Sequence, residues 1–330
     1  MKIYIITLIK LLIVVALFSF CCKREKITIE NTSGYIAFDR SEKNGNENIW
    51  LLHLATLNEI KIAGHPVYWE HTPTWLSDSE LLFLIEPPLA SCTETDIVLI
   101  NLKSGKRKLL DYWSWDDCPM YRIISADAKR NIYYCNYEVS AEDSGYSIIN
   151  VLSLMDKHPT PLHFISKIKL KEWGLRVAES PNISNDGTRF LFAGCDTFKY
   201  RTMYIEQDKW YNDIYYYNVP ERALKRLTFG DFDNDNPCWV STDSIIFSSN
   251  RNGNWDLFLM DTNGVILKQL TNTSEIDEDQ GATVSPDHKT ICYSGYDNVK
   301  KAGYIWLMSL ETGETKFLTK GGNPAWSPAR

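Results

Sequence analysis

The stretch that decides the fold is residues 235–271, DNPCWVSTDSIIFSSNRNGNWDLFLMDTNGVILKQLT, in which four short apolar runs alternate with polar turns. The runs occupy 238–240, 244–248, 255–260 and 265–270, and each has the length of an ordinary strand. The segments between them are rich in Ser, Asp, Asn and Gly, which tolerate turn geometry and satisfy their own backbone groups. This stretch therefore predicts a four-stranded antiparallel meander.

The same pattern recurs along the chain. A four-stranded sheet has two faces and cannot bury both by itself, so a repeated sheet predicts stacking of neighbouring copies. In the next copy, aligning Ser285 with Ser241 sets Gly281 against Pro237. Four further units are expected at 73–110, 119–165 (opened by Pro119), 181–228 and 279–319.

The two ends of the chain supply the parts of one more unit. Residues 323–328 have the pattern of a first strand without followers, whereas 35–38, 49–54 and 59–62 have the pattern of three strands without a first. Joining them predicts an all-β fold, a six-bladed β-propeller of four-stranded antiparallel blades with one blade shared between the N- and C-termini. Each blade then has about 50 residues, near the roughly 40 to 50 of propeller repeats. A two-sheet sandwich does not explain why the last fragment completes the first unit.

The repeat also resembles that of a known family. Its elements are Pro-x-Trp, an apolar strand, Ser-x-Arg-x-Gly-Asn-x-Asp and a final Leu-Thr, and together they look like the repeat of TolB-type six-bladed propellers. The match is close at 235–271, fair at 180–228 and 279–319, and weak at 119–165. The same repeat occurs in the propeller domains of prolyl-oligopeptidase relatives. The resemblance implies a rigid protein-binding or sensing module of the bacterial cell envelope.

Residues 1–20 have the composition of an export signal, since they contain two lysines and are otherwise almost wholly apolar. Cys21 and Cys22 follow directly, and a Cys at the end of an apolar run resembles a lipoprotein signal. We expect lipidation at Cys21, or at Cys22. Two alternatives stay open: an uncleaved anchor, because roughly 18 apolar residues can just span a bilayer, and ordinary cleaved secretion.

The expected organisation is a signal peptide at 1–20, a lipid anchor and tether at 21–33, and the propeller at 34–330. Removal of the signal takes away two lysines and no acidic residue, so the net charge changes from −7 to −9. Nucleic-acid binding depends on Lys and Arg contacts to phosphate, and an acidic body argues against it. The acidity also disfavours an electrostatic attachment to anionic lipid, leaving the N-terminal acyl chain as the membrane attachment.

Six cysteines follow Cys21 and Cys22, and no two of them form a CxxC pair. Cys92 and Cys118 are expected in loops that emerge on one face of a propeller, where an oxidising compartment would let them form a disulfide. The other four are expected to be small residues within or at the edge of strands: Cys135, Cys195, Cys238 and Cys292.

Motifs for catalysis are absent from the sequence. It has no Gly-x-Ser-x-Gly elbow, His-Glu-x-x-His, Walker loop or Rossmann glycine pattern, and its six histidines lack metal-ligand spacing. In the peptidase relatives catalysis belongs to a separate hydrolase domain, which 34–330 do not contain. We therefore predict a protein that is not an enzyme, with no catalytic residues and no cofactor.

One set of polar residues recurs with the repeat. Two residues before the proline position of successive blades stand His71, Asp117, Glu179, Asp235 and Asp279, with Gly322 in the shared blade. If each proline opens the innermost strand, these side chains converge on the mouth of the central channel. They could be structural acceptors for backbone N–H groups, a negative funnel for a cation or basic peptide, or oxygen ligands for calcium.

The expected function is that of an envelope-anchored, periplasmic or cell-surface module that binds a protein, peptide or glycan partner through one face of the ring. An outer-membrane location is compatible with such a lipoprotein. One alternative is a metal-dependent propeller enzyme of the lyase or lactonase type that uses the channel-mouth carboxylates. Another is a purely structural envelope component.

Overall fold

A computed structural model describes residues 34–43, 45–86, 96–111, 124–140, 143–153, 162–165, 172–175, 177–195, 211–273, 276–277 and 281–328. The elements that this part of the chain contains in full are β-strands, numbered β1 to β25, so the predicted all-β class is confirmed. Within the same ranges, no helix is long and apolar enough to cross a membrane.

Five sheets are each built from consecutive strands, which pair as antiparallel meanders. The first two are β4 (Trp69–Ser77), β5 (Glu80–Glu86), β6 (Asp96–Asn101) and β7 (Arg107–Asp111), then β8 (Ile124–Ala126), β9 (Asn131–Ser140), β10 (Asp143–Ser153) and β11 (Leu162–Ile165). The next two are β12 (Val177–Ile183), β13 (Arg189–Cys195), β14 (Asp213–Asn218) and β15 (Ala223–Arg226), then β16 (Asn234–Trp239), β17 (Ser244–Ser249), β18 (Asp256–Asp261) and β19 (Ile266–Gln269). The fifth is β20 (Ile276–Asp277), β21 (Ala282–Val284), β22 (Thr290–Asp297), β23 (Ala302–Ser309) and β24 (Thr315–Lys320).

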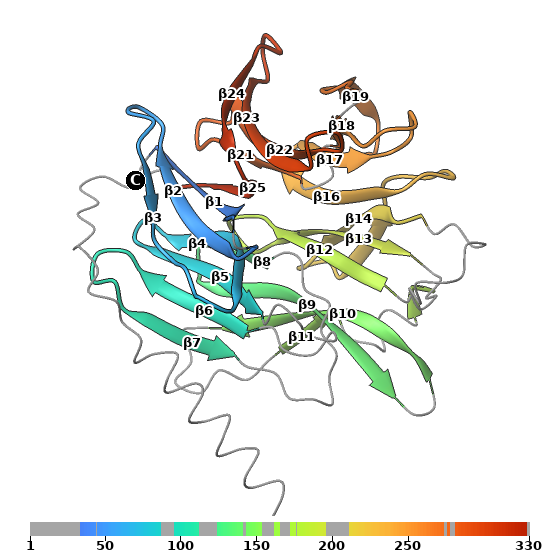
Figure 1. The fold of residues 1–330 in the computed structure, drawn as a ribbon. Helices are drawn as coiled ribbons and strands as arrows, with labels where there is room; N and C mark the ends of the chain where they lie inside the picture. The colour runs from blue at the N-terminus through green and yellow to red at the C-terminus, as the bar shows by residue number, and fades with distance from the viewer. Residues whose placement is uncertain are drawn as a thin grey trace, which may run out of the picture.

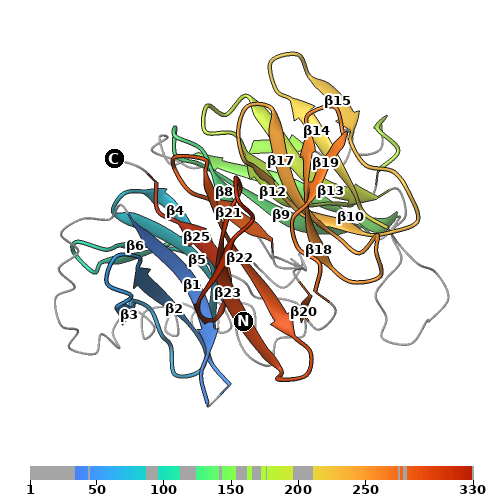
Figure 2. The ribbon, with the colours of Figure 1, turned by 90° about the horizontal axis from the view of Figure 1, so that it is seen from above.

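A further sheet combines the two ends of the described chain. Its order is β25 (Gly322–Trp326), β1 (Tyr35–Ser41), β2 (Glu47–His53) and β3 (Glu59–Lys61). Both views place β25, at the red end of the colour range, beside the blue β1 (Figures 1 and 2). Trp326 pairs with Ile36, and Ala325 pairs with Ala37. The expected pairing of the last fragment with the first strands is therefore confirmed.

Two details of the predicted repeat are wrong. The inner strand of the second sheet begins at Ile124, five residues after Pro119, so Pro119 does not mark this strand as prolines mark β4, β12, β16 and β25. In the fifth sheet both β20 and β21 pair with β22, which gives that blade a fifth strand. There Gly281 was aligned with Pro237, but the strand pairing of β21 places Ala282 at the proline position.

The second strands of several sheets are buried on both faces. In β17, the side chains of Ile245, Ile246 and Phe247 are all fully buried. Alternation of apolar and polar residues is lost there because the neighbouring sheets cover both faces. The outermost strand β19 is exposed, and Leu267 on it retains 56% of its accessible surface.

The hydrophobic core lies between sheets rather than within one of them. Six clusters each join residues of two neighbouring sheets. The cluster that joins the fifth sheet to the shared sheet contains Cys292 and Ile305 from the former and Ile36 and Phe38 from the latter. The sheets therefore follow one another around a central axis as propeller blades, in the circular arrangement of Figure 1.

The signature residues of the repeat hold the outer strands together. Asp256 begins β18, and its Oδ1 accepts a hydrogen bond from the Thr271 hydroxyl at 3.1 Å. Asp213 and Thr228 make the equivalent bond at 2.8 Å one blade earlier. The Asp and the Leu-Thr of the repeat are thus two ends of one hydrogen bond, which ties the third strand to the segment that follows the fourth.

Ser327 provides a test of the closure. Its Oγ accepts hydrogen bonds from the backbone N–H groups of Gly34 and Tyr35, at 3.2 and 3.1 Å, and the residue is fully buried. Because Ser327→Ala leaves both amides without this acceptor, we expect it to lower the free energy of unfolding by about 1 to 3 kcal/mol in urea denaturation.

Deletion of 321–330 removes β25 entirely and should abolish cooperative unfolding. Ser104→Ala, in an exposed turn, should change stability by less than about 0.5 kcal/mol. A truncated chain that melts like the full-length protein would contradict the shared blade.

Candidate functional site

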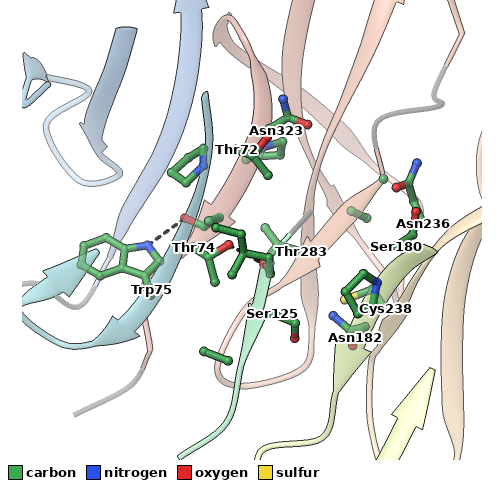
Figure 3. Close-up of a pocket in the computed structure, with 18 of the residues that line it drawn as sticks. Thr72, Thr74, Trp75, Ser125, Ser180, Asn182, Asn236, Cys238, Thr283 and Asn323 are labelled. Carbon is green, nitrogen blue, oxygen red and sulfur yellow. Dashed lines mark hydrogen bonds between the residues drawn. The ribbon is translucent and has the colours of Figure 1, made fainter. Parts of the chain in front are cut away.

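A cavity of about 250 Å³ lies where the inner strands of all the blades meet (Figure 3). The described residues that line it include no charged side chain. Its polar surface comes from hydroxyl and amide side chains, together with one thiol: Thr72, Thr74, Ser125, Ser180, Asn182, Asn236, Thr283, Asn323 and Cys238. Such a surface offers hydrogen bonds but no ion pair to an occupant.

The inner strands share a backbone irregularity at this cavity. A register shift follows the first pairs of β4, β12 and β16, and interrupts the pairing of β25 with β1. The residue before the proline position has a left-handed backbone in each case, with φ of 54° at Thr72, 52° at Ser180, 52° at Asn236 and 46° at Asn323. Gly281 has the equivalent place in the fifth sheet, with φ of 77°. Asn tolerates this conformation, but for a β-branched Thr it is strained.

Two carboxylates hold these left-handed residues from behind. Asp39 Oδ2 accepts hydrogen bonds from Thr72 N at 2.9 Å and Asn323 Nδ2 at 2.7 Å. Asp235 Oδ1 accepts from Ser180 Oγ at 2.5 Å and from its own neighbour Asn236 N at 2.7 Å. Each carboxylate therefore links the left-handed residues of two adjacent blades.

A second ring of side chains lies just after the proline position. Ser125 Oγ, Asn182 Oδ1 and Thr283 Oγ1 accept hydrogen bonds from the backbone N–H groups of Ile183, Trp239 and Trp326 respectively, at 3.1, 3.1 and 3.3 Å. In each case the donor belongs to the next blade. These bonds connect adjacent inner strands directly, although the two strands belong to different sheets and share no β-ladder.

Three of the predicted channel-mouth residues are described, and they have equivalent positions. His71, Glu179 and Asp235 occupy matching places on β4, β12 and β16, each immediately before the register shift. Gly322 has the same place on β25. None of these four lines the cavity, because the following, left-handed residue does so. A role for the set in binding stays a prediction.

Other predicted site residues lie outside the described ranges: Asp117, Asp279, Cys21, Cys22, Cys92 and Cys118. In the described part of the chain no group of three or more His, Cys, Asp or Glu could hold a metal ion. Cys195 and Cys292 are buried thiols as expected, whereas Cys238 borders the cavity and burial raises its pKa to about 12.

The sequence analysis did not identify the uncharged polar residues that line the cavity, although the sequence contains a signal for them. Four of its residues, Thr72, Ser180, Asn236 and Asn323, stand immediately before Pro73, Pro181, Pro237 and Pro324. A small polar residue before the repeated proline was therefore as regular as the acidic residue one place earlier. Its importance depends on the left-handed backbone, which the repeat pattern did not reveal.

Titratable groups gather where the shared blade meets the next one. Burial raises the pKa of the Asp39 carboxyl above its ordinary value. Burial and the nearby Asp39 charge also raise the pKa of Glu47. For His71 burial lowers the pKa, but the carboxylates of Glu86, Asp39 and Glu47 outweigh it and leave the pKa raised. All three shifts favour the protonated forms.

Comparison with known proteins identifies the type of propeller. No protein-family model matches the chain. A protein TolB homolog from Chlorobaculum tepidum is 34% identical over 87 residues, which are 26% of this chain and only 19% of that relative's length. TolB from Acinetobacter baumannii superposes with a TM-score of 0.66 at 18% identity, over 91% of this chain and 68% of that structure. The chain has a TolB-type β-propeller fold. A putative TolB from Agrobacterium tumefaciens covers 89% of this chain and 92% of its own, with a TM-score of 0.59 at 18% identity.

The TolB-type architecture is also present in proteases. The tricorn protease superposes on 86% of this chain with a TM-score of 0.61 at 13% identity, but the match covers only 26% of that protein. At such identities the likeness shows the fold alone. The shared TolB-type architecture therefore does not indicate an activity, which depends on the residues of this chain.

Asp39 and Asp235 test whether the carboxylates behind the mouth are structural. Replacement of either by Ala leaves polar groups of two blades without an acceptor, so we expect a loss of about 1 to 3 kcal/mol in the free energy of unfolding. Asp243→Ala, in an exposed turn at the other end of the blade, is the matched control and should have little effect. If instead these variants are as stable as the wild type or more stable, mutual repulsion of the carboxylates dominates and they form a negative funnel.

Proposed function

We propose that the chain is a six-bladed, non-enzymatic binding module of the cell envelope, which takes a protein, peptide or glycan partner at the mouth of its central channel. The single observation that supports this proposal is the cavity to which the inner strands of the blades contribute, with a lining of uncharged hydroxyl and amide groups. A rigid ring that presents preset donors and acceptors loses little conformational freedom on binding. The likeness to TolB proteins supports an envelope role.

The end of the propeller at which the inner strands begin is the end that we assign to the partner. Because strands alternate in direction, connections into the inner strands and loops between second and third strands share one end, where the inner strands begin. Exposed apolar side chains stand on these loops: Val67 at 54%, Phe229 at 66% and Val299 at 76% accessible surface. Apolar tips around a polar centre are suited to a macromolecular partner that covers the mouth.

We also propose that Cys21 or Cys22 carries a lipid that attaches the module to a membrane. The support is the apolar run that ends at these residues, followed by the charged 23–26. Metabolic labelling with an acyl probe should tag the wild type, while the double variant Cys21→Ala with Cys22→Ala should lose the label and move to the soluble fraction. A label that persists in the double variant would refute lipidation at these cysteines.

Photo-crosslinking in intact cells tests the binding face. A photoreactive amino acid at Val67 or Phe229 should give an adduct of one common mass. The matched control is Leu57, which is 50% exposed in the turn between β2 and β3, at the opposite end of the ring. It should give no such adduct. Adducts from Leu57 alone would place the partner at the wrong end, and no adduct from any of the three positions would remove the support for a binding module at this face.

A further inference from the structure

His71 connects a channel-lining hydroxyl to a carboxylate. Its Nδ1 lies 2.9 Å from Thr72 Oγ1, and the two atoms are hydrogen bonded. Its Nε2 lies 3.3 Å from Glu86 Oε1, at the distance of an ion pair. His71 itself is buried, with 9% of its surface accessible, while Thr72 lines the cavity. The imidazole therefore stands between the channel and an acidic group outside it.

Within the described residues, the charged groups that act on His71 are carboxylates. Glu86 comes from β5, Asp39 from β1 and Glu47 from β2, and β25 contributes only the neutral Asn323 nearby. On its own strand, Glu70 is paired with Arg107 at 2.9 Å. This surrounding negative charge favours the imidazolium and raises the pKa of His71 despite its burial. An unperturbed histidine titrates near pH 6.5, so the raised pKa places the transition of His71 above that pH.

The Glu86 carboxylate determines which nitrogen keeps the proton in the neutral ring. The contact of 3.3 Å has the distance of an ion pair without the geometry of a hydrogen bond, and the negative charge there disfavours a lone pair on Nε2 and favours the Nε2 proton. Nδ1 is then an acceptor, and it takes the Thr72 O–H as its donor. In the imidazolium, Nδ1 carries a proton and donates to Thr72 Oγ1. One added proton thus reverses the direction of the bond between His71 and Thr72.

We propose that the proton on His71 switches the Thr72 hydroxyl at the channel mouth between a hydrogen-bond donor and an acceptor toward a bound partner. When His71 is charged, the Thr72 hydrogen is free to point at a carbonyl or carboxylate oxygen of the occupant. When His71 is neutral, that hydrogen is used by Nδ1, and only oxygen lone pairs face the cavity. The channel therefore prefers acceptor groups at lower pH and N–H or O–H groups at higher pH.

The backbone of Thr72 makes this switch local. Its amide is held by Asp39 at 2.9 Å, and its φ of 54° is fixed by the register shift that follows His71. The hydroxyl can thus change its role while the backbone remains in place. The effect on a partner rests on the proposed function, whereas the protonation of His71 can be measured without any partner.

The first experiment is ¹⁵N and ¹³C NMR of the histidine rings in the full chain between pH 5 and 8.5. We expect His71 to gain a proton at Nδ1 as the pH falls, to keep Nε2 protonated when neutral, and to titrate at a higher pH than an unperturbed histidine. Glu86→Gln, which retains the shape of a side chain that is 30% exposed, should lower the midpoint. A neutral ring protonated on Nδ1, or a ring that does not titrate in this range, would overturn the proposal.

The second experiment measures the yield of the Phe229 photo-adduct at pH 6 and pH 8. Thr72→Val removes the hydroxyl and should abolish the difference in yield between the two pH values, while Thr72→Ser keeps the hydroxyl and should preserve it. If Thr72→Val has the same difference in adduct yield between pH 6 and pH 8 as the wild type, the Thr72 hydroxyl does not affect partner binding, and the proposal would fail. If NMR gives the expected titration but no variant forms an adduct at either pH, the proposed function has failed and the switch loses its role in binding.

Discussion

The structure depends on the pairing of β25 with β1. Each blade has two apolar faces and can bury both only if it has a neighbour on either side, so an open row of blades would leave two faces in water. Pairing Trp326 with Ile36 joins the two ends of the chain in one shared blade. It also brings Phe38 against Ile305 of the neighbouring blade, which covers the faces that would otherwise be exposed. Two elements almost 300 residues apart in sequence thus complete one core.

Ring closure creates a second requirement at the centre, where inner strands approach without sharing a ladder. Side chains take over the role of backbone pairing: Ser125, Asn182 and Thr283 accept amide hydrogens from the next blade. At the mouth, Asp39 accepts the amide hydrogen of Thr72 from the next blade, and Asp235 accepts the hydroxyl hydrogen of Ser180 from the preceding blade. The residues that line the central channel therefore already use some of their hydrogen-bonding groups within the protein. A partner meets a neutral, preset surface, and the negative charge lies one layer behind it.

This layering explains why the acidic positions were easier to recognise than the residues that line the cavity. Glu179 and Asp235 repeat at matching places, and the pairing of β12 and β16 confirms their equivalence. The register shift that follows then turns the next residue, rather than the acidic one, toward the cavity. A one-residue change of backbone geometry decides which side chain reaches the channel, and a repeat pattern does not contain that information. Asp39 was missed for a related reason, since it belongs to a second strand and reaches the mouth only through the fold.

The sequence by itself determined the all-β class, the meander of each blade and the completion of the first blade by residues 323–328, because these follow from apolar periodicity and from turn residues close in the chain. It also contained the Asp and Leu-Thr signature, whose partners Asp256 and Thr271 belong to one blade. Only the tertiary structure decided that Ile124 and Ala282 occupy proline positions, and that Thr72 faces the channel while His71 contacts Glu86. These relations join different blades, and their geometry is established only when the ring closes and brings distant strands into contact.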